Sequence, residues 1–266
     1  MRVRPIAKRA LAVAGGVVVA WAVAAYFILP VLWTHYERQP GLEGLPMVTR
    51  TSLHIPGDPL NVGLVGSRDE ILEAAHAAGW HSADPITLGT SIGIISSVIF
   101  NHQYLRAPVS DLFYAGRKQD LAFEAPAGRS ANRRHHVRFW LVLKEGAEGR
   151  PVWLGSATFD TGSGFSRYTA QITHHISPDI DEERDYFIAA LTRAGMLDAI
   201  YSVTGIGPTL DGRNGGGDRY FTDGEITIGV INRGAIASAE PPDLYPSPLP
   251  VEIKDSLFDA IGNLID

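Results

Sequence analysis

Four of the nine histidines stand as two adjacent pairs, in RRHHVRFW (133–140) and QITHHISPDIDEERDYF (171–187). Imidazole transfers protons near neutral pH and binds metal ions, so these pairs are the first candidates for chemistry. A helical zinc motif does not fit them, because the pairs lack i, i+4 spacing and neighbouring strand residues point apart. One histidine from each pair with Asp160 is a three-ligand alternative that no motif requires. The metal and any cofactor are therefore unassigned.

Strand alternation divides each histidine pair between the two faces of a sheet. His135 and His174 share their faces with apolar neighbours, so we interpret both as core histidines bonded to the backbone or to each other. His136 and His175 lie on the opposite faces. If the three strands concerned are neighbours in register, that side also carries a set of polar side chains, namely Arg138, Gln171, Thr173, Ser156, Thr158 and Asp160.

Such a polar cluster has the residue types needed for acid–base chemistry. A carboxylate beside an imidazole sets the tautomer and the pKa of the ring for proton transfer. A guanidinium binds phosphate or carboxylate through its planar fork. A solvated sheet face without a function is the alternative, and the residues alone favour neither interpretation. The candidate catalytic residues are His136, His175, Arg138 and Asp160.

The glycine-rich stretch LDGRNGGGDRYFTDGE (210–225) is a second candidate site. No G-K-[ST] follows, as a phosphate loop requires, and arginine and glycine stand where a calcium loop needs oxygen ligands. Three consecutive glycines at 215–217 permit backbone conformations that other residues avoid. The stretch is therefore either a shaped loop beside a binding site or an unusual turn. The candidate ligand-binding residues are Arg213, Asn214, Asp218 and Asp223.

The stretch DTGS (160–163) resembles the loop of an aspartic protease. That chemistry requires two carboxylates that share one proton. Because the sequence holds no second D-[ST]-G, we interpret DTGS as a polar turn that ends a strand.

The elements that must position these residues indicate an α+β fold, with a mainly antiparallel sheet, flanking helices and one transmembrane helix before them. Short turns between consecutive strand-like runs favour antiparallel pairing. Ser67 and Glu70 have capping-box spacing at the start of a predicted helix over 67–80. Further helices are predicted over 91–101 and from Ser177, whose hydroxyl would cap the helix. The predicted strands are 59–66, 111–116, 119–125, 135–143, 151–159, 170–176, 199–204 and 225–231.

Residues 10–33 form an uncharged apolar run, which exceeds the about 20 residues that a helix needs to cross a bilayer. Basic residues precede the run and charges of both signs follow it, so the positive-inside bias places the N-terminus in the cytoplasm. A cleaved signal peptide is the alternative, but its apolar region usually has about 7–15 residues and ends in small side chains. We favour an uncleaved anchor in the bacterial inner membrane, with the lipid bilayer as its partner and a domain that is periplasmic or otherwise extracytoplasmic.

Composition limits the remaining possibilities. The 266 residues suffice for one large domain with an ample core. The absence of cysteine excludes disulfides and thiolate ligands, and a formal net charge of −6 gives no reason to expect a nucleic-acid partner. We divide the chain into a cytoplasmic stub with the transmembrane helix (1–33), a Pro/Gly-rich linker (34–58), an α+β domain (59–240), and a Pro-rich segment with a C-terminal amphipathic helix (241–266).

Several long segments together resemble the LssY C-terminal domain family over roughly residues 50–235. In order they are PGDPLNVGLVGSRDEILEAAHAAGW, APVSDLFYAGRKQDLAFEAPAG, RRHHVRFW, GRPVWLGSATFD, QITHHISPDIDEERD and TGIGPTLDGRNGGGDRYFTDG. In some relatives this domain is fused to phosphatase-like or other multi-span membrane domains, so the resemblance implies an envelope setting. It supplies no catalytic residues, and the phosphatase activity of a fused domain does not transfer to this chain.

Two functions follow as hypotheses. The first is a ligand-binding or accessory domain near the membrane, with the His/Arg face and the glycine-rich loop as its surface and a membrane protein or an envelope lipid as its partner. The second is a hydrolase of lipid or phosphate-ester substrates, with His136 or His175 as acid/base and Arg138 binding the anion. Geometry separates them: convergence of these side chains in one pocket favours the enzyme, and dispersal over an open face favours the binding domain.

Overall fold

The structure is a computed structural model. It describes residues 5–28, 38–42, 44–83, 111–128, 133–203, 211–247, 249, 252, 253 and 256. The chain divides into two compact units, of which one comprises Gln39–Pro246 and the other comprises Met1–Arg38 with Ser247–Asp266. The candidate site residues all belong to the Gln39–Pro246 unit.

The N-terminal segment is helical, as the apolar run predicts. Helix α1 (Pro5–Val23) continues into a π-helical turn, η1 (Ala24–Ile28). The 21 residues Lys8–Ile28 are long and apolar enough to cross a membrane, and none of this span is buried in the protein. A span of this kind near the N-terminus is a membrane anchor or a signal sequence. The end of the predicted run, 29–33, lies outside the described residues.

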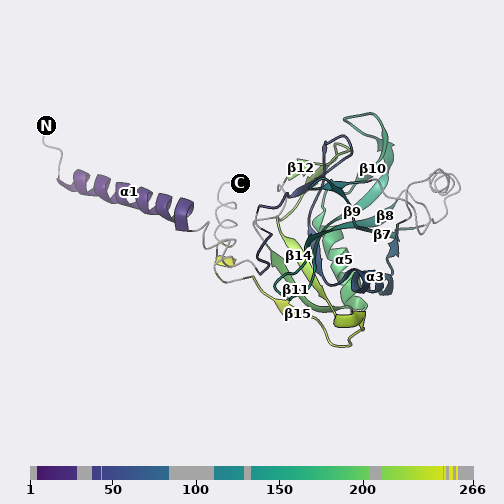
Figure 1. Ribbon diagram of the computed structural model, residues 1–266. Helices are drawn as coiled ribbons and strands as arrows, with labels where there is room; N and C mark the ends of the chain where they lie inside the picture. Colours follow the sequence, from purple (N-terminus) through teal and green to yellow (C-terminus); the bar gives the residue numbers. More distant parts are fainter. Residues whose placement is uncertain are drawn as a thin grey trace. The chain divides into compact units, whose positions relative to one another are not determined.

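A sheet of nine described strands forms the centre of the Gln39–Pro246 unit (Figure 1). Its strands are β3 (Val62–Val65), β4 (His81–Ser82), β7 (Leu121–Pro126), β8 (Arg134–Leu143), β9 (Val152–Phe165), β10 (Ile172–Ile176), β11 (Leu197–Val203), β14 (Ile226–Ile231) and β15 (Asp243–Tyr245). The order is β15-β11-β14-β3-β9-β8-β7-β4, and β10 pairs with β9 off this path. Two of the described pairings, β14–β3 and β11–β15, are parallel. The predicted α+β fold with a mainly antiparallel sheet is confirmed.

The sheet is the middle layer of the unit. Helices α3 (Arg68–Ala77) and α5 (Asp181–Arg193) cover one face (Figure 1). Strand β8 shows how the layers are separated: Phe139 enters the core on the helix side, whereas its neighbour Trp140 enters the core on the other side. Smaller elements complete the unit, namely the sheet of β2 (Pro56–Pro59), β1 (Val48–Arg50), β5 (Phe113–Tyr114) and β6 (Arg117–Lys118), the pair β12 (Asp211–Arg213) and β13 (Arg219–Phe221), and the 3-10 turn η2 (Arg233–Ala235).

The two helices begin differently. In α3 the predicted capping box is confirmed, because Glu70 N donates to Ser67 Oγ at 3.3 Å and Ser67 N donates to Glu70 Oε2 at 2.7 Å. Helix α5 begins at Asp181, later than predicted, and the expected Ser177 cap is wrong. Ser177 N instead donates to Phe159 O at 2.8 Å, which extends the contact with β9. The Asp179 carboxylate takes the capping role by accepting from the first backbone N–H groups of α5.

The predicted linker over 34–58 is corrected from residue 39 onward. Gln39, Leu42 and Thr49 are buried, and β1 pairs with β2 within this stretch. A Cβ on Gly57 would lie 2.6 Å from Thr49 Oγ1, so this glycine permits a close approach of chain segments. The prolines and glycines therefore form tight structure that packs on the sheet. At the other end β15 extends the unit past the predicted boundary at residue 240.

Two further predictions concern 91–101 and 241–266. The helix predicted over 91–101 lies outside the described residues, as does most of the C-terminal helix. Within the Pro-rich segment, Asp243–Tyr245 form the parallel strand β15 beside β11.

The interpretation of DTGS as a turn is wrong. Strand β9 runs through these residues to Phe165 and pairs there with β10. This extension places Asp160 within the sheet, where β8 and β10 both reach it.

Candidate functional site

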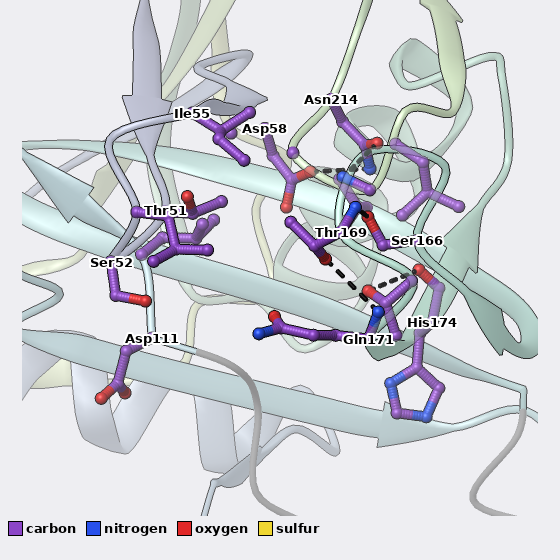
Figure 2. Close-up of a pocket in the computed structure, with 18 of the residues that line it drawn as sticks. Thr51, Ser52, Ile55, Asp58, Asp111, Ser166, Thr169, Gln171, His174 and Asn214 are labelled. Carbon is purple, nitrogen blue, oxygen red and sulfur yellow. Dashed lines mark hydrogen bonds between the residues drawn. The ribbon is translucent and has the colours of Figure 1, made fainter.

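A cavity of about 390 Å³ lies where β8, β9 and β10 meet the turn between β1 and β2 and the glycine-rich loop. It lies on the face of the sheet opposite the helices, and most of its lining side chains are hydroxyl, amide or charged groups. Figure 2 shows Thr51, Ser52 and Asp111 on one side, and the hairpin residues Ser166, Thr169, Gln171 and His174 on the other. The cavity is therefore a polar chamber between elements that are distant in the sequence.

The register of β8 and β9 brings the first charged groups together. Arg134 pairs with Asp160, His136 with Thr158, and Arg138 with Ser156. Directly opposed residues of antiparallel strands share one face, so these side chains converge. They are also buried, with exposed fractions of 2% for Arg134 and Asp160, 3% for His136 and 5% for Arg138. His136, Arg138 and Asp160 thus lie on one buried face of the sheet, and all three line the cavity.

The assignment of the second histidine pair is reversed. His174, which we expected in the core, lines the cavity with its Nδ1 3.7 Å from Asp160 Oδ2. His175 turns away from Asp160, and its Nδ1 lies 2.8 Å from Asp218 Oδ1. The cause is a shift in register between β9 and β10: His175 is opposite Gly162, but Ile176 is opposite Asp160. The extra residue in β9 exchanges the faces that simple alternation assigns.

His135 lies on the apolar side of the sheet, which the helices cover, but its partner is neither the backbone nor His174, which were the partners that we expected. Its Nδ1 lies 2.8 Å from Glu183 Oε2 of α5, and its ring stacks on Tyr186 with centroids 4.0 Å apart. Burial raises the pKa of Glu183, which the hydrogen bond from His135 opposes. This acid therefore anchors α5 to β8 in addition to lying in the first helical turn.

Asp160 is the centre of the charged cluster. Its Oδ2 lies 3.4 Å from His136 Nδ1, 3.7 Å from His174 Nδ1 and 3.7 Å from Arg134 Nε. Burial raises the pKa of Asp160 to about 7, against the opposing effect of the two arginines. Burial lowers the pKa of His136 well below its usual value and that of His174 to about 4. Near neutral pH the two imidazoles are therefore uncharged, and Asp160 is able to accept or release a proton.

Arg138 is held by a second acid across the cavity. Its Nη1 lies 3.5 Å from Asp58 Oδ2, and Asn214 Nδ2 donates to Asp58 Oδ1 at 3.2 Å. Burial raises the pKa of Asp58, although the charge of Arg138 opposes this. Burial likewise lowers the pKa of Arg138, although the charges of Asp58 and Asp160 oppose this.

Several buried nitrogens at the cavity lack a hydrogen-bond partner in the described part of the protein. They are Arg138 Nε, His136 Nε2 and His174 Nε2. A buried polar group without a partner costs about 1–3 kcal/mol. The three residues that carry these atoms all line one chamber, and a bound ligand is one way in which such hydrogen bonds are completed. Among the described residues, no group of three or more His, Asp and Glu side chains is arranged to hold a metal ion.

One of the four candidate ligand-binding residues in the glycine-rich loop lies at the cavity. Asn214 lines the cavity, and its Oδ1 accepts from Gly216 N and Asp218 N, which shapes the loop. Asp218 stands behind it, bonded to His175. Arg213 donates to Gly217 O, and Asp223 pairs with Arg184 of α5 at 2.9 Å. Thus Arg213 and Asp223 do not join Asn214 at the cavity.

Sequence reasoning missed Asp58, Arg134 and His174. Arg134 had a signal, because it precedes His136 by two residues and so shares its face. His174 was assigned to the wrong face of the sheet, because the sequence gives no sign of the bulge in β9. Asp58 had no usable signal, since its stretch was interpreted as a linker.

The pH dependence of stability should report on Asp160. Between about pH 4 and 7 its raised pKa makes the folded state hold an additional proton, so its contribution to stability is lost as pH rises through about 7. The lowered pKa of His174 acts oppositely, because its contribution is present above about 6.5 and is lost as pH falls toward 4. We expect Asp160→Asn to make the free energy of unfolding rise more steeply from pH 4.5 to 6.5, by up to about 1.4 kcal/mol per pH unit.

Urea denaturation at several pH values measures this slope. Asp211→Asn is the matched control, because Asp211 belongs to an exposed ion pair. Parallel pH profiles for wild type and Asp160→Asn would contradict the raised pKa of Asp160.

Comparison with known proteins gives a family match. The model of the family described as LssY C-terminus matches residues 42–226. This range contains every residue that lines the cavity. No curated protein and no solved structure matches the chain.

Proposed function

The chain belongs to the LssY C-terminus family, and from this premise we propose that its folded unit binds a phosphate-ester ligand in the polar cavity. The main support for this proposal is a set of buried nitrogens without hydrogen-bond partners. Arg138, His136 and His174 line one chamber, and each has a buried nitrogen with no hydrogen-bond partner among the described residues. A phosphate group presents several acceptor oxygens to such donors, and the planar guanidinium binds it through two parallel hydrogen bonds.

The acids of the cavity are compatible with an anionic ligand. Burial raises the pKa of Asp160 to about 7, which reduces its negative charge near neutral pH, and burial raises the pKa of Asp58 as well. Asp111 at the wall is paired with Lys118 Nζ at 2.7 Å. The remaining wall offers hydroxyl and amide groups, which suit the ester portion of a polar ligand.

Removing the fork of Arg138 should weaken binding of methyl phosphate, the simplest probe of this class. Hydrogen bonds to charged groups contribute about 1.5–3 kcal/mol, so we expect Arg138→Met to weaken binding by about 10- to 100-fold and Arg138→Lys by about tenfold. Calorimetric titration of the full chain in an amphipathic polymer measures this. Arg219→Met, which removes an exposed arginine, should bind like wild type. Folded Arg138→Lys with unchanged affinity would count against the proposal.

We infer that Lys8–Ile28 is an uncleaved anchor and that the folded unit lies outside the cytoplasmic membrane. The length of the apolar helix and the absence of buried residues in its span support this location, as do the basic residues before it. The domain would then act at the outer side of the inner membrane, near lipids and other membrane proteins.

An alkaline phosphatase reporter fused after residue 266 tests this orientation. We expect high reporter activity and full-length chain in the membrane fraction, because the reporter enzyme needs disulfides that form only after export. A cytoplasmic reporter such as β-galactosidase at the same position should be inactive. The reverse pattern would place the domain in the cytoplasm, and a shortened soluble product would identify a signal sequence.

Hydrolysis of the bound ester is the second candidate function. Asp160, with its pKa near neutral between two uncharged imidazoles, is the observation that favours it. Such a group is able to accept a proton from an attacking water, while Arg138 holds the phosphate. His136 and His175 were the predicted acid/base residues. In this proposal His136 keeps that role and His174 replaces His175.

A further inference from the structure

An apolar groove of about 570 Å³ adjoins the polar cavity. Its apolar wall is formed by Pro46, Met47, Val48, Phe113 and Ala115. The groove and the cavity share lining residues, namely Thr51, Ser52 and Phe113. The two hollows therefore lie next to each other at these shared residues, where one molecule with a polar end and an apolar end could contact both.

The cavity itself is bordered by exposed apolar side chains. Leu53 and Ile172 both line it, and they are 55% and 82% exposed. Ile172 pairs with Phe165, which is 70% exposed on the neighbouring strand β9. Large apolar side chains gathered at the edge of a polar chamber are expected where the natural ligand or its source is itself apolar.

We propose that the ligand is a membrane lipid of the phosphate-ester class, with its head group in the cavity and an alkyl chain in the groove. This inference rests on the proposed function, because it assigns the phosphate to the same cavity. The membrane supplies the ligand: the apolar span Lys8–Ile28 holds the protein at a bilayer. The groove provides an apolar wall for the alkyl chain of the ligand. The residues shared by the groove and the cavity lie beside the point where the head group meets this chain.

Chain-length dependence tests the inference. Methyl, butyl and hexyl phosphate carry the same head group, and they are titrated against the full chain in an amphipathic polymer, so that no bilayer competes. Affinity should rise about fourfold for each methylene that the groove buries. Val48→Gln places an amide in the groove and should remove most of this gain, while leaving the affinity for methyl phosphate unchanged. Leu244→Gln, at an exposed position on β15 outside both pockets, is the matched control and should retain the gain.

The outcomes separate the two proposals. Equal affinities for the three phosphates would overturn the lipid assignment while leaving phosphate binding in place. A gain that Val48→Gln does not reduce would also overturn it, because the alkyl chain would then lie on another surface. Failure of all three phosphates to bind would remove the proposed function itself. Thermal unfolding of Val48→Gln confirms that any lost gain arises in a folded protein.

Discussion

Replacing Arg134 by Met should lower the free energy of unfolding by about 3–5 kcal/mol. Arg134 is 2% exposed, and its Nη1 lies 3.0 Å from Glu124 Oε2 while its Nε lies 3.7 Å from Asp160 Oδ2. Methionine fills a similar volume but removes the positive charge, so two buried carboxyl groups lose their compensation. The loss of unfolding free energy therefore measures how much it costs to bury these carboxyl groups without a compensating positive charge.

An exposed ion pair provides the control for this variant. Arg219 Nη2 also lies 3.0 Å from an acid, Asp211 Oδ2, but the two side chains are 68% and 63% exposed. Arg219→Met should cost less than about 1 kcal/mol, because water screens the pair. Urea denaturation of the full chain, followed by near-ultraviolet circular dichroism, gives both values. Similar losses for the two variants would mean that the buried cluster carries no special electrostatic cost.

The second large effect is expected on the rate of ester hydrolysis. If the cavity hydrolyses its ester, Asp160→Asn should lower kcat/KM by about 10²–10⁴-fold, because general acid–base groups contribute this much. The amide preserves the size of the side chain but neither accepts nor releases a proton near neutral pH. A panel of phosphate esters, from methyl phosphate to longer alkyl esters, provides the substrates.

The adjacent histidines give a matched pair for this assay. His174→Gln removes a ring 3.7 Å from Asp160, whereas His175→Gln removes a ring that contacts Asp218 instead. We expect a large loss of activity for the first and a small loss for the second. Full activity of Asp160→Asn, or equal losses for both histidines, would exclude the proposed roles. Absence of hydrolysis by wild type leaves binding as the function.

Local patterns predicted the part of the site that lies on one regular strand. Alternation along β8 placed His136 and Arg138 on one face, and the register with β9 carries them to Asp160. The capping box of α3 was equally readable, because its hydrogen bonds join residues only three positions apart. Both features depend on neighbours in the sequence.

The missed part of the site depends on contacts between distant segments. The irregularity in β9 has no strong signal in DTGSGF, whose glycines suggest a turn, and so the faces of His174 and His175 were exchanged. Asp58 belongs to a stretch whose prolines and glycines are also typical of a linker. Its partners Arg138 and Asn214 are 80 and 156 residues away along the chain, so only tertiary packing reveals them.

Binding of phosphate in the polar cavity is tested most directly by titrating the full chain, carrying ¹⁵N-labelled histidine, with methyl phosphate. We expect saturable shifts of the ring ¹⁵N signals of His136 and His174, because both residues line the cavity. His76 and His81, on α3 and β4, should not move. Unchanged signals from His136 and His174 at phosphate concentrations that saturate calorimetric binding would mean that the phosphate binds outside the cavity.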